Sequence, residues 1–211
     1  VGNLDLEAMR PLVERYLGAL PALNRKETWR DLDIDPPPGV IESVVRKGVE
    51  PKSRTAIVFR GPFRYDLEQR TVFRALGLVL ESRLRGIVRE ELGGTYGVSV
   101  RPAYAKIPDE EYSLTIGFGS DPARMDELAG AVFHEIKTLR GAGPSAKEVD
   151  DAREALLREH ETGRKENAWL IAQLAARYQL GEDPREILAL EDSFRSLTPE
   201  AVREAARAYL D

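Results

Sequence analysis

The sequence predicts an α+β fold, in which an antiparallel sheet is covered on one face by helices. Two observations lead to this prediction. Two pairs of alternating, Val- and Ile-rich segments, each turning at a short Pro-containing loop, are separated by one long helical segment. The rest of the chain, from about residue 120 onward, carries helical periodicity. Paired strands followed by a run of helices are typical of α+β layers.

Length and composition narrow the protein class. The 211 residues are 42% hydrophobic, which suffices for one large domain or a domain plus a fragment. The net charge of -5 is spread over 31 basic and 36 acidic residues, so we expect no nucleic-acid partner. The absence of cysteine excludes disulfides, thiolate catalysis and Cys-type zinc sites. No apolar run has the length of a transmembrane helix, so we expect no membrane partner and a soluble chain, with cytoplasm and periplasm both open.

The first 39 residues are predicted to lie outside the main domain. The chain begins with neither an initiator Met nor an apolar signal region, so we expect an excised piece. Helical spacing of apolar residues predicts a helix over Leu6–Leu20. A polar stretch follows and closes with three prolines and Gly39, which neither continue a helix nor join a central strand. We therefore predict that 1–23 is the terminal helix of a preceding domain, 24–39 a Pro-rich linker and 40–211 the C-terminal domain.

Four strands and one long helix should form the first half of that domain. Two strands are predicted at Val40–Val49 and Ser53–Arg60, around a turn at Glu50-Pro51-Lys52. Two more, at Thr95–Ala105 and Glu111–Gly119, should be antiparallel neighbours. Between the pairs we expect a helix over Tyr65–Leu92, ending at Gly93 and Gly94. Its apolar stripe consists of Val72, Phe73, Leu76, Val79, Leu80, Leu84, Ile87 and Val88.

Helices should make up the second half. One is predicted from Ser120-Asp121-Pro122 to about Arg140. Ser145 begins the next, because Glu148 three residues later completes a capping-box pattern, and this helix runs toward Gly163. Three more are predicted at Asn167–Leu180, Pro184–Phe194 and Thr198–Leu210.

The junction between the long helix and the following strand is the most informative segment for function. Arg89 lies in the last turns of the helix, and Tyr96 opens the strand seven residues later, beyond the glycine hinge at Gly93 and Gly94. A guanidinium is a rigid fork of donors and a phenol adds one more, so the pair suits a peptide carbonyl or carboxylate. An ordinary surface ion pair for Arg89 is disfavoured, because the position one turn back holds Arg85. Packing of Tyr96 within the sheet is the alternative for that residue.

This segment resembles the Arg and Tyr motif in the C-terminal half of the pitrilysin, or insulinase, family of zinc metallopeptidases. The bacterial zinc proteases associated with coenzyme PQQ look nearest. The resemblance implies the half-clamshell unit of the pitrilysin and mitochondrial processing peptidase-like metallohydrolase fold. In the family, the matching residues face the zinc and bind substrate. Tyr96 would then donate to the developing oxyanion, and Arg89 would position the peptide backbone.

The zinc site of that family is not encoded in this chain. Family members hold zinc through a His-x-x-Glu-His motif and a further Glu. The histidines here are His134 and His160, each alone within a helix, and Leu156 stands where Glu159-His160 would need a further His. We predict that both histidines are solvated, that no catalytic residue, metal or cofactor belongs to this chain, and that zinc lies in an N-terminal catalytic half. The dense charges around His160 predict a solvated helix face, or, by the resemblance, part of the chamber wall.

The predicted function is that of a substrate-binding, non-catalytic C-terminal half of a zinc metalloendopeptidase. It would complete the peptide chamber, contact the peptide through Arg89 and Tyr96, and be inactive alone. Some relatives lack the zinc motif in every domain, so a zinc-less structural, assembly or peptide-binding subunit of the same fold is the alternative. A free-standing α+β protein in which Arg89 and Tyr96 coincide by chance is a third, weaker interpretation.

Overall fold

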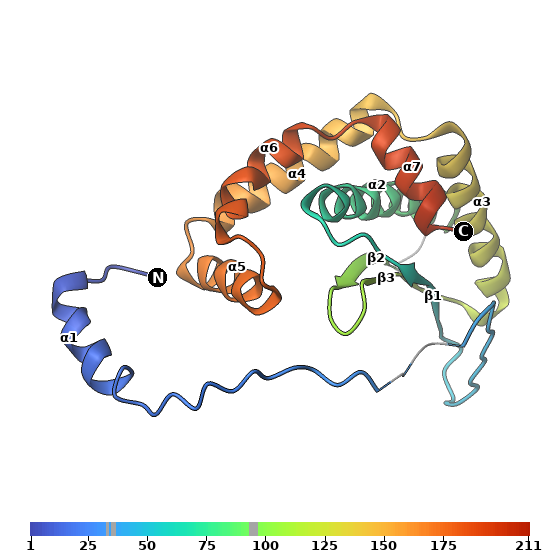
Figure 1. Cartoon of the computed structure of the whole chain (residues 1–211). Helices are drawn as coiled ribbons and strands as arrows, with labels where there is room; N and C mark the ends of the chain where they lie inside the picture. The colour runs from blue at the N-terminus through green and yellow to red at the C-terminus, as the bar shows by residue number, and fades with distance from the viewer. Residues whose placement is uncertain (33, 35–36, 93–96) are drawn as a thin grey trace.

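The N-terminal segment carries a helix without any buried residue, and at Gly2 it approaches Asn167. The computed structural model describes residues 1–32, 34, 37–92 and 97–211, and of residues 88–92 the backbone alone. Helix α1 (Leu6–Tyr16) ends four residues before the predicted boundary, and all its residues are exposed. The carboxylate of Asp5 begins it by accepting hydrogen bonds from the backbone N–H groups of Glu7 (3.0 Å) and Ala8 (3.1 Å). Of residues 17–52, those that the structure describes form neither a helix nor a strand (Figure 1).

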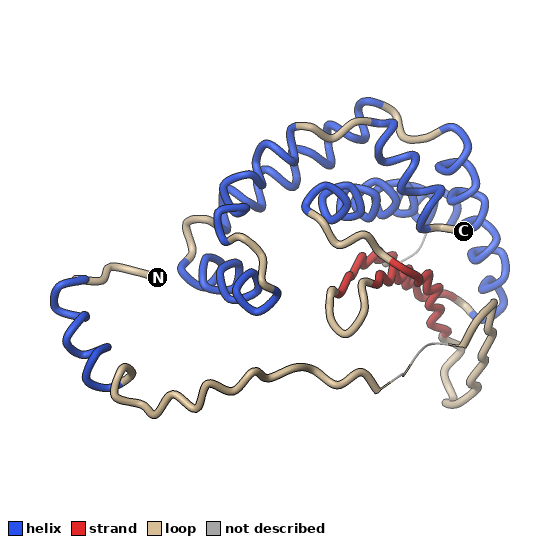
Figure 2. Tube along the Cα trace, in the orientation of Figure 1, coloured by secondary structure: helices blue, strands red, loops and turns tan. Residues whose placement is uncertain are grey.

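A sheet of three antiparallel strands forms the base of the domain. The strands are β1 (Ser53–Pro62), β2 (Val98–Ala105) and β3 (Glu111–Ser120), in the order β1-β3-β2. Ile116 at the centre of β3 pairs with Ile57 of β1 and Val100 of β2. Every second residue of β3, from Tyr112 to Ser120, is buried, because alternate side chains of a strand point to opposite faces. Helices cover only the face that carries these residues (Figure 2), which confirms the predicted α+β class.

The predicted strand Val40–Val49 is wrong. The described residues 37–52 form no ladder with any strand, and the side chains of Val40, Val45 and Val49 are 85–102% exposed. The β-branched pattern predicted a strand, but a strand needs hydrogen-bonding partners and a packed face. In this chain β1 pairs with β3 instead, and its other edge makes no ladder with the described residues.

Helix α2 (Leu67–Leu92) lies across the sheet and forms the centre of the core (Figure 1). Of its predicted apolar stripe, Phe73, Leu76 and Leu80 are fully buried. The side chain of Val88 is not among those that the structure describes. The remaining helices are η1 (Pro122–Arg124), α3 (Met125–Ala142), α4 (Ala146–Gly163), α5 (Asn167–Leu180), η2 (Pro184–Ala189), α6 (Leu190–Arg195) and α7 (Pro199–Tyr209). The predicted boundaries hold within a few residues. The segment predicted as one helix over 184–194 divides into a 3-10 turn followed by a short α-helix.

One guanidinium joins three helices. Arg83 of α2 donates to Glu135 of α3 (Nη1 to Oε1, 2.7 Å) and to both carboxylate oxygens of Glu148 in α4 (Nε to Oε1, 2.5 Å; Nη2 to Oε2, 2.9 Å). Glu148 also forms the predicted capping box with Ser145. These hydrogen bonds, above all those from Arg83, lower the pKa of the Glu148 carboxyl to about 2. The network thus sets the positions of α3 and α4 relative to α2.

Two tyrosines connect α7 to the sheet and to α2. The buried hydroxyl of Tyr112 on β3 donates to the backbone carbonyl of Tyr209 at the end of α7 (3.0 Å). The hydroxyl of Tyr209 donates in turn to Oε1 of Gln69 on α2 (3.0 Å). Both rings pack against Phe73 within the core.

None of the helices in the described part of the chain is long and apolar enough to cross a membrane.

Candidate functional site

The candidate site is the junction between α2 and β2. The backbone of Arg89 lies in the last turns of α2, while its side chain is outside what the structure describes. The hinge residues Gly93 and Gly94 and the phenol of Tyr96 also lie outside the described residues. The predicted convergence of Arg89 and Tyr96 on a peptide therefore remains a prediction. The structure does describe the elements on both sides of the junction.

Helix α2 and strand β2, the elements on either side of this junction, are packed tightly together earlier along the helix. A Cβ built on Gly77 of α2 would lie 2.8 Å from Cγ of Pro102 on β2, so the helix backbone approaches the strand closely. One turn further along α2, Oε2 of Glu81 accepts a 3.5 Å contact from the backbone N–H of Val100. Leu84 then continues the contact into the core. One rigid packing interface thus holds α2, which carries Arg89, against β2, which follows Tyr96.

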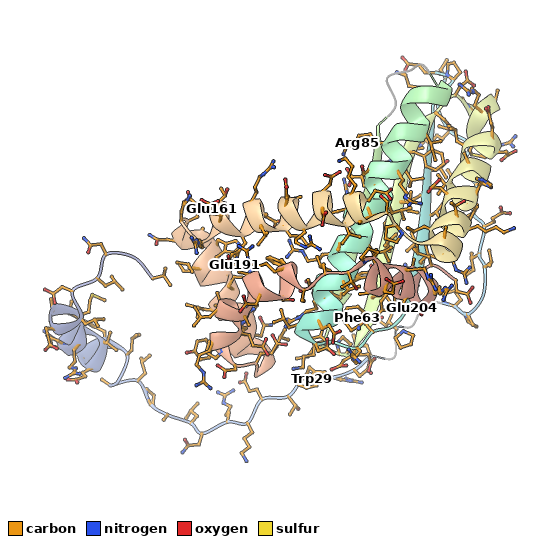
Figure 3. All side chains as sticks on the ribbon, turned by 90° about the horizontal axis from the view of Figure 1, so that it is seen from above. Trp29, Phe63, Arg85, Glu161, Glu191 and Glu204 are labelled. Atoms are coloured by element: carbon orange, nitrogen blue, oxygen red, sulfur yellow. The ribbon has the colours of Figure 1, made fainter. Side chains whose placement is uncertain are left out.

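The charges beside the junction are partly neutralised. Glu81 forms an ion pair with Arg85, which lies one turn later on α2 and is labelled in Figure 3. The side chain of Arg85 is 60% exposed, so this pair lies at the surface and contributes little to stability. Glu81, the nearest acid on the stripe toward Arg89 in the sequence, is therefore already engaged by another guanidinium.

Strand β2 has an edge that could receive an extended peptide. Among the described strands, β2 pairs only with β3. Pro102 lies within it and has no N–H, as is typical of edge strands, where a missing donor interrupts no central ladder. The opposite face of the sheet, which no helix covers (Figure 2), carries small and polar residues such as Ser99, Ser113 and Thr115. An edge and an uncovered face are both geometrically suited to contact a peptide.

The two histidines behave differently. His134 on α3 is exposed, as predicted. The prediction of a solvated side chain is wrong for His160, whose ring centroid lies 5.3 Å from that of Trp169 and 6.0 Å from that of Phe194. Burial, followed by the nearby charge of Arg164, lowers the pKa of the His160 imidazole. The reason is tertiary, because α5 and α6 fold back against the end of α4.

The described residues do not fit a zinc ion. No three His, Cys, Asp or Glu side chains in this part of the molecule come together in a group that could hold a metal. The charged stretch near His160 lies largely in solvent, with exposed ion pairs between Glu161 and Lys165 and between Glu154 and Arg158. Glu159 is engaged by Arg74 of α2 (2.8 Å). The prediction that the charged stretch near His160 is a solvated helix face agrees with these contacts.

Arg177 is a residue that the sequence did not single out. It is the buried residue of α5, with only 4% of its surface exposed. In the sequence, Trp169, Ala172, Gln173 and Ala176 form a helical stripe for which we expect core packing, and Arg177 continues that stripe four residues after Gln173. A weak signal was available in Gln173, one turn earlier, whose side chain accepts a hydrogen bond from Arg177 (2.8 Å).

The chain matches a known protein family over most of its length. The family model described as "Peptidase M16 inactive domain" matches residues 1–156 and continues through the predicted linker. The chain is 26% identical over 195 residues to "Zinc protease PQQL-like" of Arabidopsis thaliana, which covers 85% of this chain and 20% of the relative. The chain thus spans about a fifth of the length of this curated relative.

Solved structures share the fold. The periplasmic protease PqqL from Escherichia coli superposes with a TM-score of 0.78 at 24% identity, covering all of this chain (100%) and 23% of the PqqL chain. A peptidase M16 inactive domain from Pseudomonas fluorescens superposes with a TM-score of 0.63 at 22% identity, covering 77% of this chain and 39% of the other. At these identities the likeness shows the fold alone.

Proposed function

Since the chain belongs to the family of the peptidase M16 inactive domain, we propose that it is the substrate-binding, non-catalytic half of a zinc metalloendopeptidase. The resemblance to pitrilysin-type peptidases is confirmed by this membership. In the proposal, the domain completes a peptide chamber with an N-terminal catalytic half, in the same or a separate chain. Zinc belongs to that other half, where it would activate the hydrolytic water. The single observation that carries the proposal is the family match over residues 1–156.

The packing of α2 against β2 supports the proposed role of Arg89 and Tyr96. Because the two elements share one core, the helix that carries Arg89 and the strand that follows Tyr96 keep a fixed relative position. Preorganised donors stabilise a developing negative charge without the cost of reorienting during the reaction. In the proposal, Tyr96 donates to the carbonyl oxygen as its charge develops, and Arg89 positions the backbone of the peptide.

Tyr96→Phe in the full-length enzyme that contains this chain tests the proposal. If the phenol stabilises the transition state, turnover of a peptide substrate should fall by about one to three orders of magnitude with little change in KM. Tyr178→Phe is the matched control, because the side chain of Tyr178 is 71% exposed on α5, and it should leave turnover unchanged. Wild-type turnover in Tyr96→Phe would refute the assignment.

Arg89→Lys tests the other residue separately. Lysine keeps the charge but loses the planar fork, so a positioning role predicts a raised KM with a smaller change in turnover. Arg85→Lys, on the same helix and already paired with Glu81, is the control and should leave KM as in the wild type. Equal effects of the two substitutions would contradict a specific role for Arg89.

A zinc-less structural or assembly subunit is the second candidate. It is kept because the only histidines of the chain are His134 and His160, which do not form the inverted motif. The sequence encoded upstream of Val1, or in an adjacent gene, discriminates the two functions. A His-x-x-Glu-His motif there supports the peptidase, and its absence from both supports the subunit.

The division of the chain is part of the proposal. We assign 1–23 to the end of a preceding domain, 24–39 to a linker and 40–211 to the C-terminal domain. The exposure of α1 on all sides supports this assignment, whereas the family match spans both sides of the linker. Limited proteolysis of the 211-residue chain should cut within 24–39 and leave a stable fragment close to 40–211. Protection of that segment would contradict the division.

A further inference from the structure

A cavity of about 230 Å³ lies where the start of α2 and the ends of α4 and β2 meet α5 and α6. Four aromatic side chains contribute to its walls, namely Tyr65, Tyr104, Trp169 and Phe194. Drug-sized ligands occupy pockets of roughly 300–1,000 Å³. This cavity is smaller, so it suits a group about the size of one amino-acid residue.

Two of the three guanidinium groups in the wall are neutralised by acids. Arg70 donates to Glu182 (3.1 Å) and Glu186 (3.3 Å). Arg74 donates to Glu159 (2.8 Å). These two cations therefore have counter-charges within the protein. Because Arg70 meets two carboxylates, these two arginines and their three acids leave one surplus negative charge beside the cavity.

The third guanidinium, that of Arg177, forms no ion pair with any described residue. Both of its hydrogen bonds come from Nη1, one to the backbone carbonyl of Gln173 (3.2 Å) and one to Oε1 of the same residue (2.8 Å). Only 4% of the residue surface is exposed, and the buried Nε atom has no hydrogen-bond partner in the described structure. Burying a charge without a partner is costly, so the arrangement points to a ligand that supplies the missing anion.

The geometry of the unpaired donors indicates which anion. Nε–H and Nη2–H lie side by side on one edge of a guanidinium and match the two oxygens of a carboxylate. Arg83 uses this edge to bind Glu148, with distances of 2.5 Å and 2.9 Å. In Arg177 the same edge makes no hydrogen bond within the described part of the chain.

His160, which also lines this cavity, has a second unpaired polar atom. Nδ1 of His160 is buried and makes no hydrogen bond to any described residue. Because the pKa of this imidazole is lowered, the neutral ring is favoured and can donate one N–H. Gly163 at the end of α4 admits the indole of Trp169, since a Cβ at Gly163 would lie 2.7 Å from Cδ1 of the indole. The aromatic wall beside His160 is therefore closely packed.

We propose that this cavity binds a carboxylate carried on a small apolar or aromatic body. The Nε and Nη2 edge of Arg177 grips the carboxylate, and the aromatic walls enclose the body. The acids Glu159 and Glu182 in the wall disfavour a dianion such as phosphate, so the site favours a monoanion. The carboxylate belongs either to the C-terminal residue of a peptide or to a free organic acid. The site goes beyond the proposed function and does not depend on Arg89 or Tyr96.

Fluorescence of Trp169 measures binding directly. The chain contains two tryptophans, and Trp29 lies on the N-terminal linker with 61% of its surface exposed (Figure 3). In the full 211-residue chain carrying Trp29→Phe, the remaining emission reports on the cavity wall. The probes are 3-phenylpropionate, N-acetylphenylalanine, N-acetylphenylalanine amide and sulfate. We expect saturable quenching by at least one of the two acids, with the amide and sulfate binding at least about tenfold more weakly.

Variants identify the residue responsible. Arg177→Met should weaken binding of the acid by at least about tenfold, and Arg177→Lys should weaken it as well, because lysine lacks the fork. Arg185→Met is the matched control, since the side chain of Arg185 is 84% exposed and should leave affinity unchanged. If Arg177→Met fails to fold, the affinities of the acid and the amide for the chain with Arg177 intact still test whether the cavity recognises a carboxylate.

Each result supports or overturns the proposal. Binding of N-acetylphenylalanine alone identifies a peptide C-terminus, and binding of 3-phenylpropionate alone identifies a free acid; both results support a carboxylate site. Equal affinity for acid and amide would show a purely apolar cavity, and equal affinity for sulfate would show an unspecific anion site. Either of these results, or absence of binding by both acids, overturns the inference. The turnover of Tyr96→Phe has no bearing on whether the cavity binds a carboxylate. The proposed function and this cavity site can therefore fail separately.

Discussion

Gly77 of α2 packs directly against the ring of Pro102 on β2, so closely that no side chain fits between them. A Cβ at Gly77 would lie 2.8 Å from Cγ and 2.9 Å from Cδ of Pro102. The proline ring is stiff and belongs to a strand paired with β3, so it cannot move aside freely. This contact sets how closely the helix that carries Arg89 approaches the strand that follows Tyr96.

Gly77→Ala should therefore destabilise the protein, although alanine favours a helix over glycine. We expect a loss of about 1–3 kcal/mol in the free energy of unfolding, because the added methyl group overpacks the interface. Gly86→Ala on the same helix is the control, since nothing lies within 4 Å of its added Cβ. That substitution should leave stability unchanged or raise it by up to about 1 kcal/mol. Urea unfolding of both variants checks the prediction, and equal midpoints would show that the interface relaxes.

The stability contributed by Glu148 should depend on pH. Its pKa in the folded state is lowered to about 2, below the value of about 4.3 expected for an unfolded Glu. The ionised carboxylate thus favours folding above about pH 4.5, and this contribution is lost as the pH falls toward 2. The free energy of unfolding of the wild type should exceed that of Glu148→Gln most clearly above pH 5, and the difference should shrink through this window.

Glu161→Gln is the control for the pH experiment. The carboxylate of Glu161 also meets a cation, Lys165 (2.9 Å), but both side chains are more than 60% exposed. An exposed pair contributes little to stability, so this variant should follow the wild-type urea midpoint at each pH. A difference between wild type and Glu148→Gln that stays constant from pH 6 to pH 2 would contradict the role assigned to Arg83 and Glu148.

Tyr112→Phe should loosen α7 from the sheet. The variant leaves the buried carbonyl of Tyr209 without the 3.0 Å hydrogen bond from the Tyr112 hydroxyl, which should cost about 1–2 kcal/mol of the free energy of unfolding. Tyr178→Phe, at a side chain 71% exposed, should change stability by no more than about 0.5 kcal/mol. Hydrogen exchange should also accelerate at the backbone amides of α7 in Tyr112→Phe. Unchanged stability and exchange would show that the hydroxyl is not needed to dock α7.

Local patterns predicted most of the elements. The alternation in β3 and the stripe of α2 each specify which face is buried, because buried side chains recur every second residue in a strand and about every 3.6 residues in a helix. The capping box of Ser145 and Glu148 located the start of α4 for the same local reason. The same alternation predicted a strand over Val40–Val49, which is absent, because a strand forms only where a partner supplies hydrogen bonds.

The site could be predicted only in part. The sequence identified Arg89 and Tyr96 through a resemblance, and their side chains lie outside the described residues. The sequence did not predict that Arg177 and His160 share a cavity, because they lie on different helices with no motif that joins them. Their common cavity arises from the folding of α5 and α6 against the end of α4, which no local spacing encodes.

The sequence by itself therefore determined the α+β class, the buried faces of α2 and β3 and the membership of a peptidase family, because these depend on periodicity and short motifs along the chain. Only the tertiary structure decided that Gly77 meets Pro102, that Arg83 joins three helices and that Arg177 is buried without an ion pair to any described residue. The physical reason is that burial and electrostatic partnership are properties of neighbours in space. Those neighbours are here separated by tens of residues in the chain, and packing of the complete domain brings them together.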